Sequence, residues 1–241
     1  MQASLAINRA ALSSHVRIVL LDELKEPLRF ATRFAVGQDP FDLAGFTASF
    51  ATLSNGLAQR PAQALIFSCE GLSGRTPGKN GITDYAAAIP LAGAIETAMR
   101  AVFGGKVDLT FLFTTRCAGP WLNSAWRHNL AGYRITDDFD AFCARYGKAA
   151  DFKAITDQIA ANLPRAKVIV TPLEQVFDHP AKAFFQLLDL PAGLAETLRN
   201  PGVKNAGISD TLATELLAIN RNPVTDAEAK RLRSRAAGLA R

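Results

Sequence analysis

The fold is decided by residues 107–133, VDLTFLFTTRCAGPWLNSAWRHNLAGY, which predict a strand, a tight turn and a helix in succession. Residues 109–114 are apolar, aromatic or β-branched, a composition typical of a strand buried inside a parallel sheet. The helix is expected from about Pro120 to Leu130, because Pro is favoured at the first helical position and Gly132 fits a stop just past its end. This succession predicts an α/β protein.

Polar side chains gather where that strand meets that helix. Arg116 ends the strand, while Ser124, Arg127 and His128 are spaced i, i+3 and i+4 and so share one helix face. Free N–H groups and the helix dipole favour an anion at a helix N-terminus, and an Arg fork suits a phosphate. The sequence therefore predicts an anion site here. The alternative is an ordinary strand-to-helix corner, with Arg116 in a surface ion pair.

The pattern Arg-x7-Ser after a strand, with the aromatic Trp126 two residues past the Ser, resembles the 3′-phosphate-binding segment of the sulfotransferase family. These enzymes use 3′-phosphoadenosine 5′-phosphosulfate, PAPS, on a P-loop-NTPase type of α/β fold. The resemblance implies that Arg116 and Ser124 hold the 3′-phosphate of PAPS. It adds Arg127 from the same helix face, and Lys204 from a late basic loop that closes over the nucleotide in many members.

The resemblance also implies a three-layer fold with a mostly parallel sheet, of which the sequence as written lacks the first strand. Residues 2–12 resemble the family helix that follows a strand and a Gly-rich, Lys-containing loop for the 5′-phosphosulfate. No Gly-x-x-x-x-Gly-Lys pattern occurs before residue 15. Two explanations stay open: the start of the sequence has been placed too far downstream, or the protein is a relative that has lost its donor loop.

Glu70 is the candidate catalytic residue. It comes just after the predicted strand 64–68, and residues past the carboxyl ends of strands line the ligand crevice of open α/β sheets. In the family this position carries the residue that activates the acceptor, so the resemblance implies that Glu70 is the general base. The alternatives are that Glu70 caps the following turn or pairs with Arg75 or Arg116.

The rest of the chain is predicted to be a single domain over residues 1–241, with 222–241 forming a peripheral C-terminal helix. Residues 16–21 fit either a short strand or the apolar tail of a connection. A further strand is expected at 166–171. Helices are expected at 2–12, 26–36, 42–58, 85–103, 136–146, 151–163, 180–188, 210–220 and from 225 onward.

Composition limits the classes of function. The chain has 241 residues, 49% hydrophobic and 20% charged, which fits one globular domain. A net charge of +5 suits an anionic nucleotide, but the cations are dispersed, so we expect no nucleic-acid partner. The three cysteines and three histidines lack metal-ligand spacing, so a cytoplasmic protein with reduced thiols and no metal is expected. No signal peptide or membrane span is predicted.

These observations predict transfer of a sulfuryl group from PAPS to a hydroxyl or amine, with Glu70 as the base and a small-molecule or carbohydrate acceptor. We expect transfer to be impaired without the N-terminal loop. The alternative is a non-catalytic nucleotide- or glycan-binding module of the same fold. The sequence predicts neither the acceptor nor an oligomeric state.

Overall fold

The computed structural model describes residues 2–59, 64–176, 179, 181–188, 190–191, 193–202 and 207–238. The chain divides into two compact units. We call them the sheet unit, Met1–Arg75, Tyr85–Thr115 and Phe152–Lys204, and the helical unit, Thr76–Asp84, Arg116–Asp151 and Asn205–Arg241. The expectation of a single domain over residues 1–241 stays a prediction.

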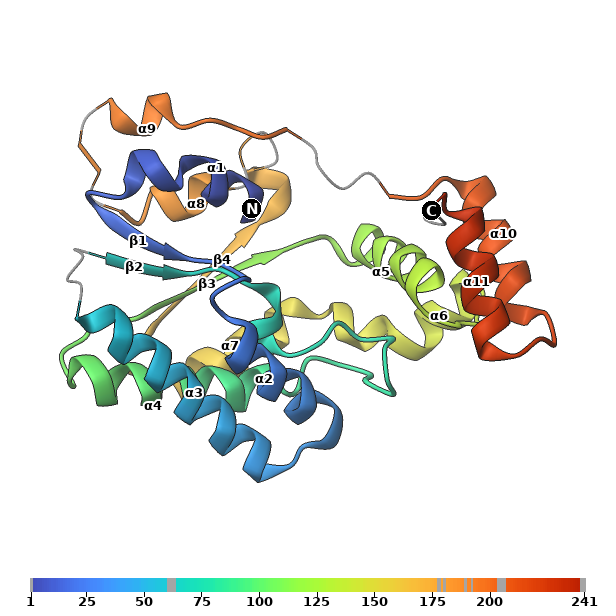
Figure 1. Ribbon diagram of the computed structural model, residues 1–241, viewed down its shortest axis with the longest axis horizontal. Coiled ribbons are helices and arrows are strands. Elements are labelled where there is room, and N and C mark those ends of the chain that lie inside the picture. The colour runs from blue at the N-terminus through green and yellow to red at the C-terminus, as the bar shows by residue number, and fades with distance from the viewer. Residues whose placement is uncertain are drawn as a thin grey trace. The chain divides into compact units, whose positions relative to one another are not determined.

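The sheet unit contains four described strands (Figure 1). They are β1 (Val16–Val19), β2 (Ala64–Phe67), β3 (Thr110–Thr115) and β4 (Lys167–Pro172). Its helices are α1 (Gln2–Leu12), α2 (Lys25–Gly37), α3 (Pro40–Ala58), η1 (Glu70–Ser73), α4 (Ala88–Phe103), α7 (Phe152–Asn162), η3 (Leu173–Gln175), α8 (Lys182–Phe185) and α9 (Leu194–Thr197).

The four strands form two parallel pairs. β1 pairs with β2, with Val16 opposite Ala64, and β3 pairs with β4, with Thr110 opposite Lys167. The three strands expected from the sequence are confirmed, and β1 decides in favour of a strand where residues 16–21 had left two options open. The α/β class is therefore confirmed, with both pairs parallel.

Apolar helix faces cover the strands. On one face of the first pair, Leu5 and Leu12 of α1 pack with Ile18 and Ile66. On α3, the Phe50 ring lies 4.9 Å from that of Phe67 at the end of β2. Buried residues of α4, of α7 and of the position just after α7 pack in the same way against Phe111 and Phe113, two partly buried side chains of β3. The buried residues are Ala88, Ala92, Ile159 and Leu163. Parallel strands are covered by helices because their side chains are largely apolar on both faces of the sheet.

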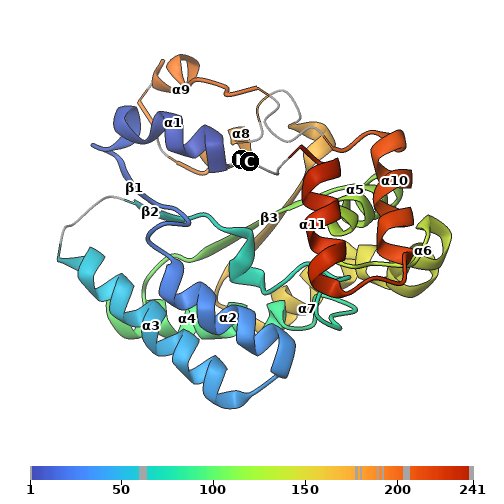
Figure 2. The same cartoon turned by 45° about the vertical axis from the view of Figure 1, so that its right-hand side comes forward.

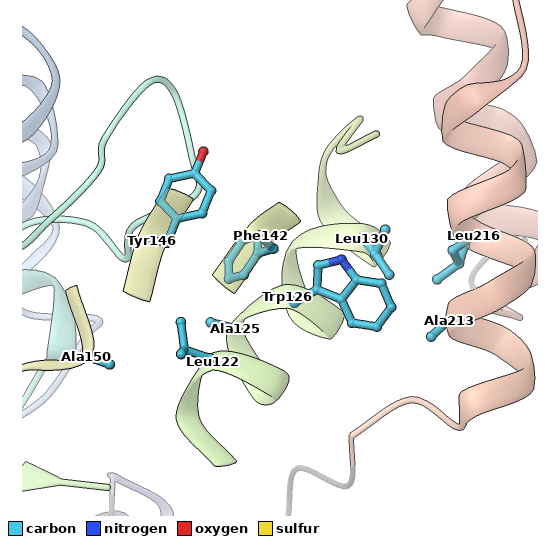
Figure 3. Close-up of a cluster of buried hydrophobic side chains, with 9 residues drawn as sticks. All are labelled: Leu122, Ala125, Trp126, Leu130, Phe142, Tyr146, Ala150, Ala213 and Leu216. Carbon is cyan, nitrogen blue, oxygen red and sulfur yellow. The ribbon is translucent and has the colours of Figure 1, made fainter. Parts of the chain in front are cut away.

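The helical unit contains α5 (Ala118–Gly132), α6 (Phe139–Tyr146), η2 (Gly147–Ala150), α10 (Asp210–Arg221) and α11 (Asp226–Ala236), which gather together in Figure 2. Side chains from α5, α6 and α10 meet in a common apolar core (Figure 3). At its centre the indole Nε1 of Trp126 donates a hydrogen bond to the backbone oxygen of Asp137 at 3.0 Å. The expected C-terminal helix is α11, and Ala229 of this helix is fully buried.

Local capping chemistry sets several boundaries. Asp39, Asp138, Ser209 and Thr225 accept backbone N–H hydrogen bonds at the starts of α3, α6, α10 and α11, as side chains at N-caps do. Several expected boundaries are wrong. α6 begins at Phe139 rather than at residue 136, because its N-cap is Asp138. α4 begins at Ala88 rather than at residue 85, because its N-cap makes no side-chain hydrogen bond and the preceding residues turn instead. α8 is a four-residue helix, shorter than the expected 180–188.

Candidate anion-binding site

The candidate site lies at the short connection between β3 and α5. β3 ends at Thr115, Arg116 follows, and α5 starts at Ala118. The first N–H groups of an α-helix have no intrahelical acceptor, so Ala118 and Gly119 direct N–H groups out of the N-terminus. The aligned backbone dipoles add partial positive charge there. The predicted succession of strand, arginine and helix N-terminus is thus confirmed, although the helix starts two residues earlier than Pro120.

The two faces of α5 differ in burial. Ser124 and His128 are exposed and Arg127 is half-buried, so the three lie on the solvent side of the helix. Ser124 lies on the second turn, about 9 Å along the helix axis from Ala118. The residues of the opposite face are buried: Leu122, Ala125, Trp126, Asn129 and Leu130.

Arg116 and Ser124 share one property beyond their place at this corner. Both side chains are exposed, and neither makes a hydrogen bond or ion pair with any residue that the structure describes. The surface ion pair that we considered for Arg116 is not formed within the described residues. A guanidinium in that state keeps its full fork of donors for a ligand, which is what bidentate binding of a phosphate requires.

Arg127 lies on the same side of α5, but its donors are used inside the protein. Its Nε donates to Asn123 Oδ1 at 2.7 Å, its Nη1 to the backbone oxygen of Ile208 at 2.6 Å, and its Nη2 to the carboxylate of Asp210. The structure therefore brings Arg127 together with the start of α10. Its predicted role as a donor ligand stays a prediction.

Glu70 belongs to the sheet unit, where it opens η1 two residues after Ser68. Its side chain is exposed and makes no ion pair or hydrogen bond within the described parts of the chain. Neither alternative considered for it, a turn cap or an ion pair with an arginine, is formed there. The neighbouring Cys69 thiol has a raised pKa, chiefly because burial disfavours the thiolate, with the Glu70 carboxylate adding to the effect.

Lys204, the remaining residue predicted to bind the donor, lies outside the described residues.

Sequence reasoning missed a docked turn in the helical unit. Ile82 N–H donates to the Lys79 oxygen at 3.0 Å across Asn80 and Gly81, which both have positive φ. The signal was present, because Asn-Gly is the preferred pair of a type I′ turn.

The described parts of the chain contain neither a membrane-spanning helix nor a cluster of metal-ligating side chains. No described helix is long and apolar enough to cross a membrane. No group of three or more His, Cys, Asp or Glu side chains in the described ranges is arranged to hold a metal ion. In comparisons with known proteins, no family model, no curated protein and no solved structure gives a significant match to this chain.

Proposed function

We propose that this chain is a sulfotransferase-like protein that binds the 3′-phosphate of PAPS with Arg116 and Ser124. The observation that carries the proposal is the exposed guanidinium of Arg116 at the N-terminus of α5, which has no hydrogen-bond or ion-pair partner among the described residues. A phosphate there would meet a bidentate cation and a helix dipole, and the Ser124 hydroxyl lies farther along the same helix. Each of these stabilises a dianion more than a neutral ligand.

For the fold, we propose a three-layer arrangement of the P-loop-NTPase type. In it the two strand pairs belong to one sheet, and a further strand would lie between β2 and β3. Two-stranded parallel sheets are marginal alone, which supports a larger common sheet. The edges of the two pairs also differ. β1 carries the charged Arg17 and β4 carries Lys167 and a terminal Pro172, features that protect an outer edge.

The other two strands lack such protection. β2 reads ALIF and β3 reads TFLFTT, without a charge or a proline. Because natural proteins blunt the strand edges that face solvent, these two edges are suited to the inside of a sheet. Strand chemistry therefore supports an order in which β2 and β3 flank the same position and β1 and β4 lie outside.

Glu70 is assigned the role of base in this proposal. An acceptor hydroxyl or amine attacks the sulfur of PAPS, a bond from the acceptor oxygen or nitrogen to sulfur forms, and the bond from sulfur to the phosphate oxygen breaks. The acceptor proton passes to the Glu70 carboxylate, and 3′,5′-ADP leaves. The exposure of Glu70 and its lack of a described partner support this role, since a general base must be within reach of the acceptor.

Calorimetric titration tests the donor site. We expect the protein to bind 3′,5′-ADP more tightly than 5′-AMP, which lacks the 3′-phosphate. We expect Arg116→Ala to weaken the binding of 3′,5′-ADP by about tenfold or more, which corresponds to about 1.4 kcal/mol. Arg235→Ala is the matched control, because Arg235 is also exposed in the helical unit and its guanidinium has no described partner. Equal affinity for the two nucleotides would overturn the proposal.

A transfer assay with labelled PAPS separates the enzyme from a binding module. The sequence given has no Gly-x-x-x-x-Gly-Lys loop before residue 15, so we expect little or no transfer from it. Binding of 3′,5′-ADP without transfer would favour the alternative, a nucleotide-binding module of the same fold. Robust turnover would refute the expectation that the loop is needed.

A further inference from the structure

Two arginines lie close in sequence on the solvent side of the strand-to-helix corner, and their guanidinium groups are used differently. That of Arg116 makes no hydrogen bond or ion pair with a described residue, whereas that of Arg127 makes three hydrogen bonds. The Arg127 side chain is 20% exposed, so most of its surface is covered by what it touches. Arg127 therefore has a different role from Arg116 at the proposed phosphate site.

The pattern of its bonds leaves Arg127 poorly suited to a phosphate. A guanidinium binds an oxyanion with one of two flat edges, Nε with Nη2 or Nη1 with Nη2. In Arg127 each of the three nitrogens already donates to the protein: Nε to Asn123, Nη1 to the backbone oxygen of Ile208 and Nη2 to Asp210. Neither edge therefore offers a pair of nitrogens without a protein partner.

Those partners connect two distant parts of the chain. Asn123 belongs to α5, while Ile208 and Asp210 precede and open α10, about eighty residues later in the sequence. α10 packs against the apolar core of the helical unit, where its residues Ala213 and Leu216 belong to the same buried cluster as Trp126. The Arg127 guanidinium therefore fixes the first residues of α10 beside the polar face of α5, one turn from Ser124.

We infer that Arg127 is a positioning residue. Its hydrogen bonds hold residues 208–210 against α5 next to the proposed phosphate site, an arrangement that we call the bracket, and Arg127 does not itself bind the phosphate. The inference about binding rests on the proposed function. The bracket itself is a property of the helical unit alone, and it is measurable without any nucleotide.

A double-mutant cycle with 3′,5′-ADP as the probe tests the inference. We expect Arg127→Ala and Asp210→Asn each to weaken binding by about three- to tenfold, and the double variant to be no weaker than the weaker single one, because both changes break the same bracket. A direct ligand would behave otherwise. Asp210→Asn would then strengthen binding by releasing Nη2, and that result would overturn the inference.

Arg127→Lys separates geometry from charge. Lysine keeps the positive charge but cannot bond Asn123, Ile208 and Asp210 at once, so we expect it to bind 3′,5′-ADP no better than Arg127→Ala. We also expect Arg116→Ala to reduce the salt dependence of binding and Arg127→Ala to leave it unchanged, since only the first removes a charge that meets the phosphate. Rescue by lysine would overturn the inference.

Hydrogen exchange keeps the bracket testable if the proposed function fails. Should the wild-type protein not bind 3′,5′-ADP, the nucleotide proposal falls, while the bracket still predicts faster amide exchange in the first turn of α10 in Arg127→Ala. The reporter is the Leu212 amide, which donates to Ser209 Oγ. We expect at least about threefold faster exchange there than in Arg235→Ala, and an unchanged rate would refute the bracket.

Discussion

The two faces of α5 are built from the same helix and serve different ends. The buried face joins the apolar core of the helical unit, where Trp126 and Leu130 pack with Leu216 (Figure 3). The solvent face carries Ser124, whose side chain makes no hydrogen bond within the described residues, one turn from Arg127, which makes three. The difference teaches that stability and the proposed binding can be altered separately within fifteen residues.

The largest expected effect is on the buried face. Trp126→Ala should lower the free energy of unfolding by about 3–5 kcal/mol, because it leaves a large cavity and removes the hydrogen bond to the Asp137 backbone. Urea denaturation measures the change. Trp126→Phe is the control that keeps most of the packing and loses the N–H donor. A loss under about 1 kcal/mol for Trp126→Ala would mean that this face is not the core.

The second-largest effect on stability is expected at Gly78, in the turn that packs against the buried face of α5. Gly78 has a φ of +91°, and a Cβ there would lie 2.4 Å from Asn129 Nδ2. We expect Gly78→Ala to cost about 1–3 kcal/mol, from backbone strain and from lost docking. Gly81→Ala is the matched control, since Gly81 also has positive φ but no atom lies within 4 Å of its added Cβ. Equal losses in thermal unfolding would show that docking on Asn129 contributes nothing.

A smaller effect is expected on acidification, at the exposed N-cap of α6. Asp138 caps α6, and the N–H of Ala141, helped by Arg221, lowers the pKa of its carboxyl group below the usual value. A lowered folded-state pKa contributes stability that is present above the unfolded pKa of about 3.9 and is lost as pH falls through the folded value.

Comparing unfolding midpoints between pH 7 and pH 2.5 isolates this contribution. Asp138→Asn is the informative variant, because Asn also caps helices but does not titrate. We expect its midpoint to fall less steeply with acid than that of the wild type. Parallel curves for the two proteins would contradict the assignment of the pKa shift to the cap.

The smallest effect on stability is expected on the solvent face. Ser124→Ala should change the free energy of unfolding by no more than about 0.5 kcal/mol, since Ser124 is exposed and Ala is the better helix former. The proposed function predicts that the same variant binds 3′,5′-ADP several-fold more weakly. Thermal unfolding and titration of one preparation check both statements. Weakened folding with unchanged binding would invert the comparison between the two faces.

Patterns within one element could be predicted from the sequence. The runs at 64–68, 109–114 and 166–171 are strands because each is rich in apolar, aromatic or β-branched residues and bounded by turn residues. The polar face of α5 follows from helical spacing alone. Caps such as Asp138 were accessible for the same reason, since they act over three residues.

Contacts between distant segments could not be predicted. Nothing in the sequence around Arg127 indicates that its partner is Asp210, because the pairing depends on where α10 returns. The start of α4 was missed in a similar way. Thr83 and Asp84 form a plausible cap in sequence, but they belong to the excursion into the helical unit that Gly78 anchors on Asn129. Tertiary packing overrides local capping preference there.

The unprotected edges of β2 and β3 also bear on how the protein behaves in bulk. Unpaired N–H and C=O groups along an apolar strand are a template for intermolecular pairing. Leu65 and Leu112 are only half-buried, so the side chains on these strands would favour such pairing rather than oppose it. Self-association that grows with protein concentration would therefore arise from β2 and β3 of the sheet unit rather than from β1 and β4, which carry the charges of Arg17 and Lys167.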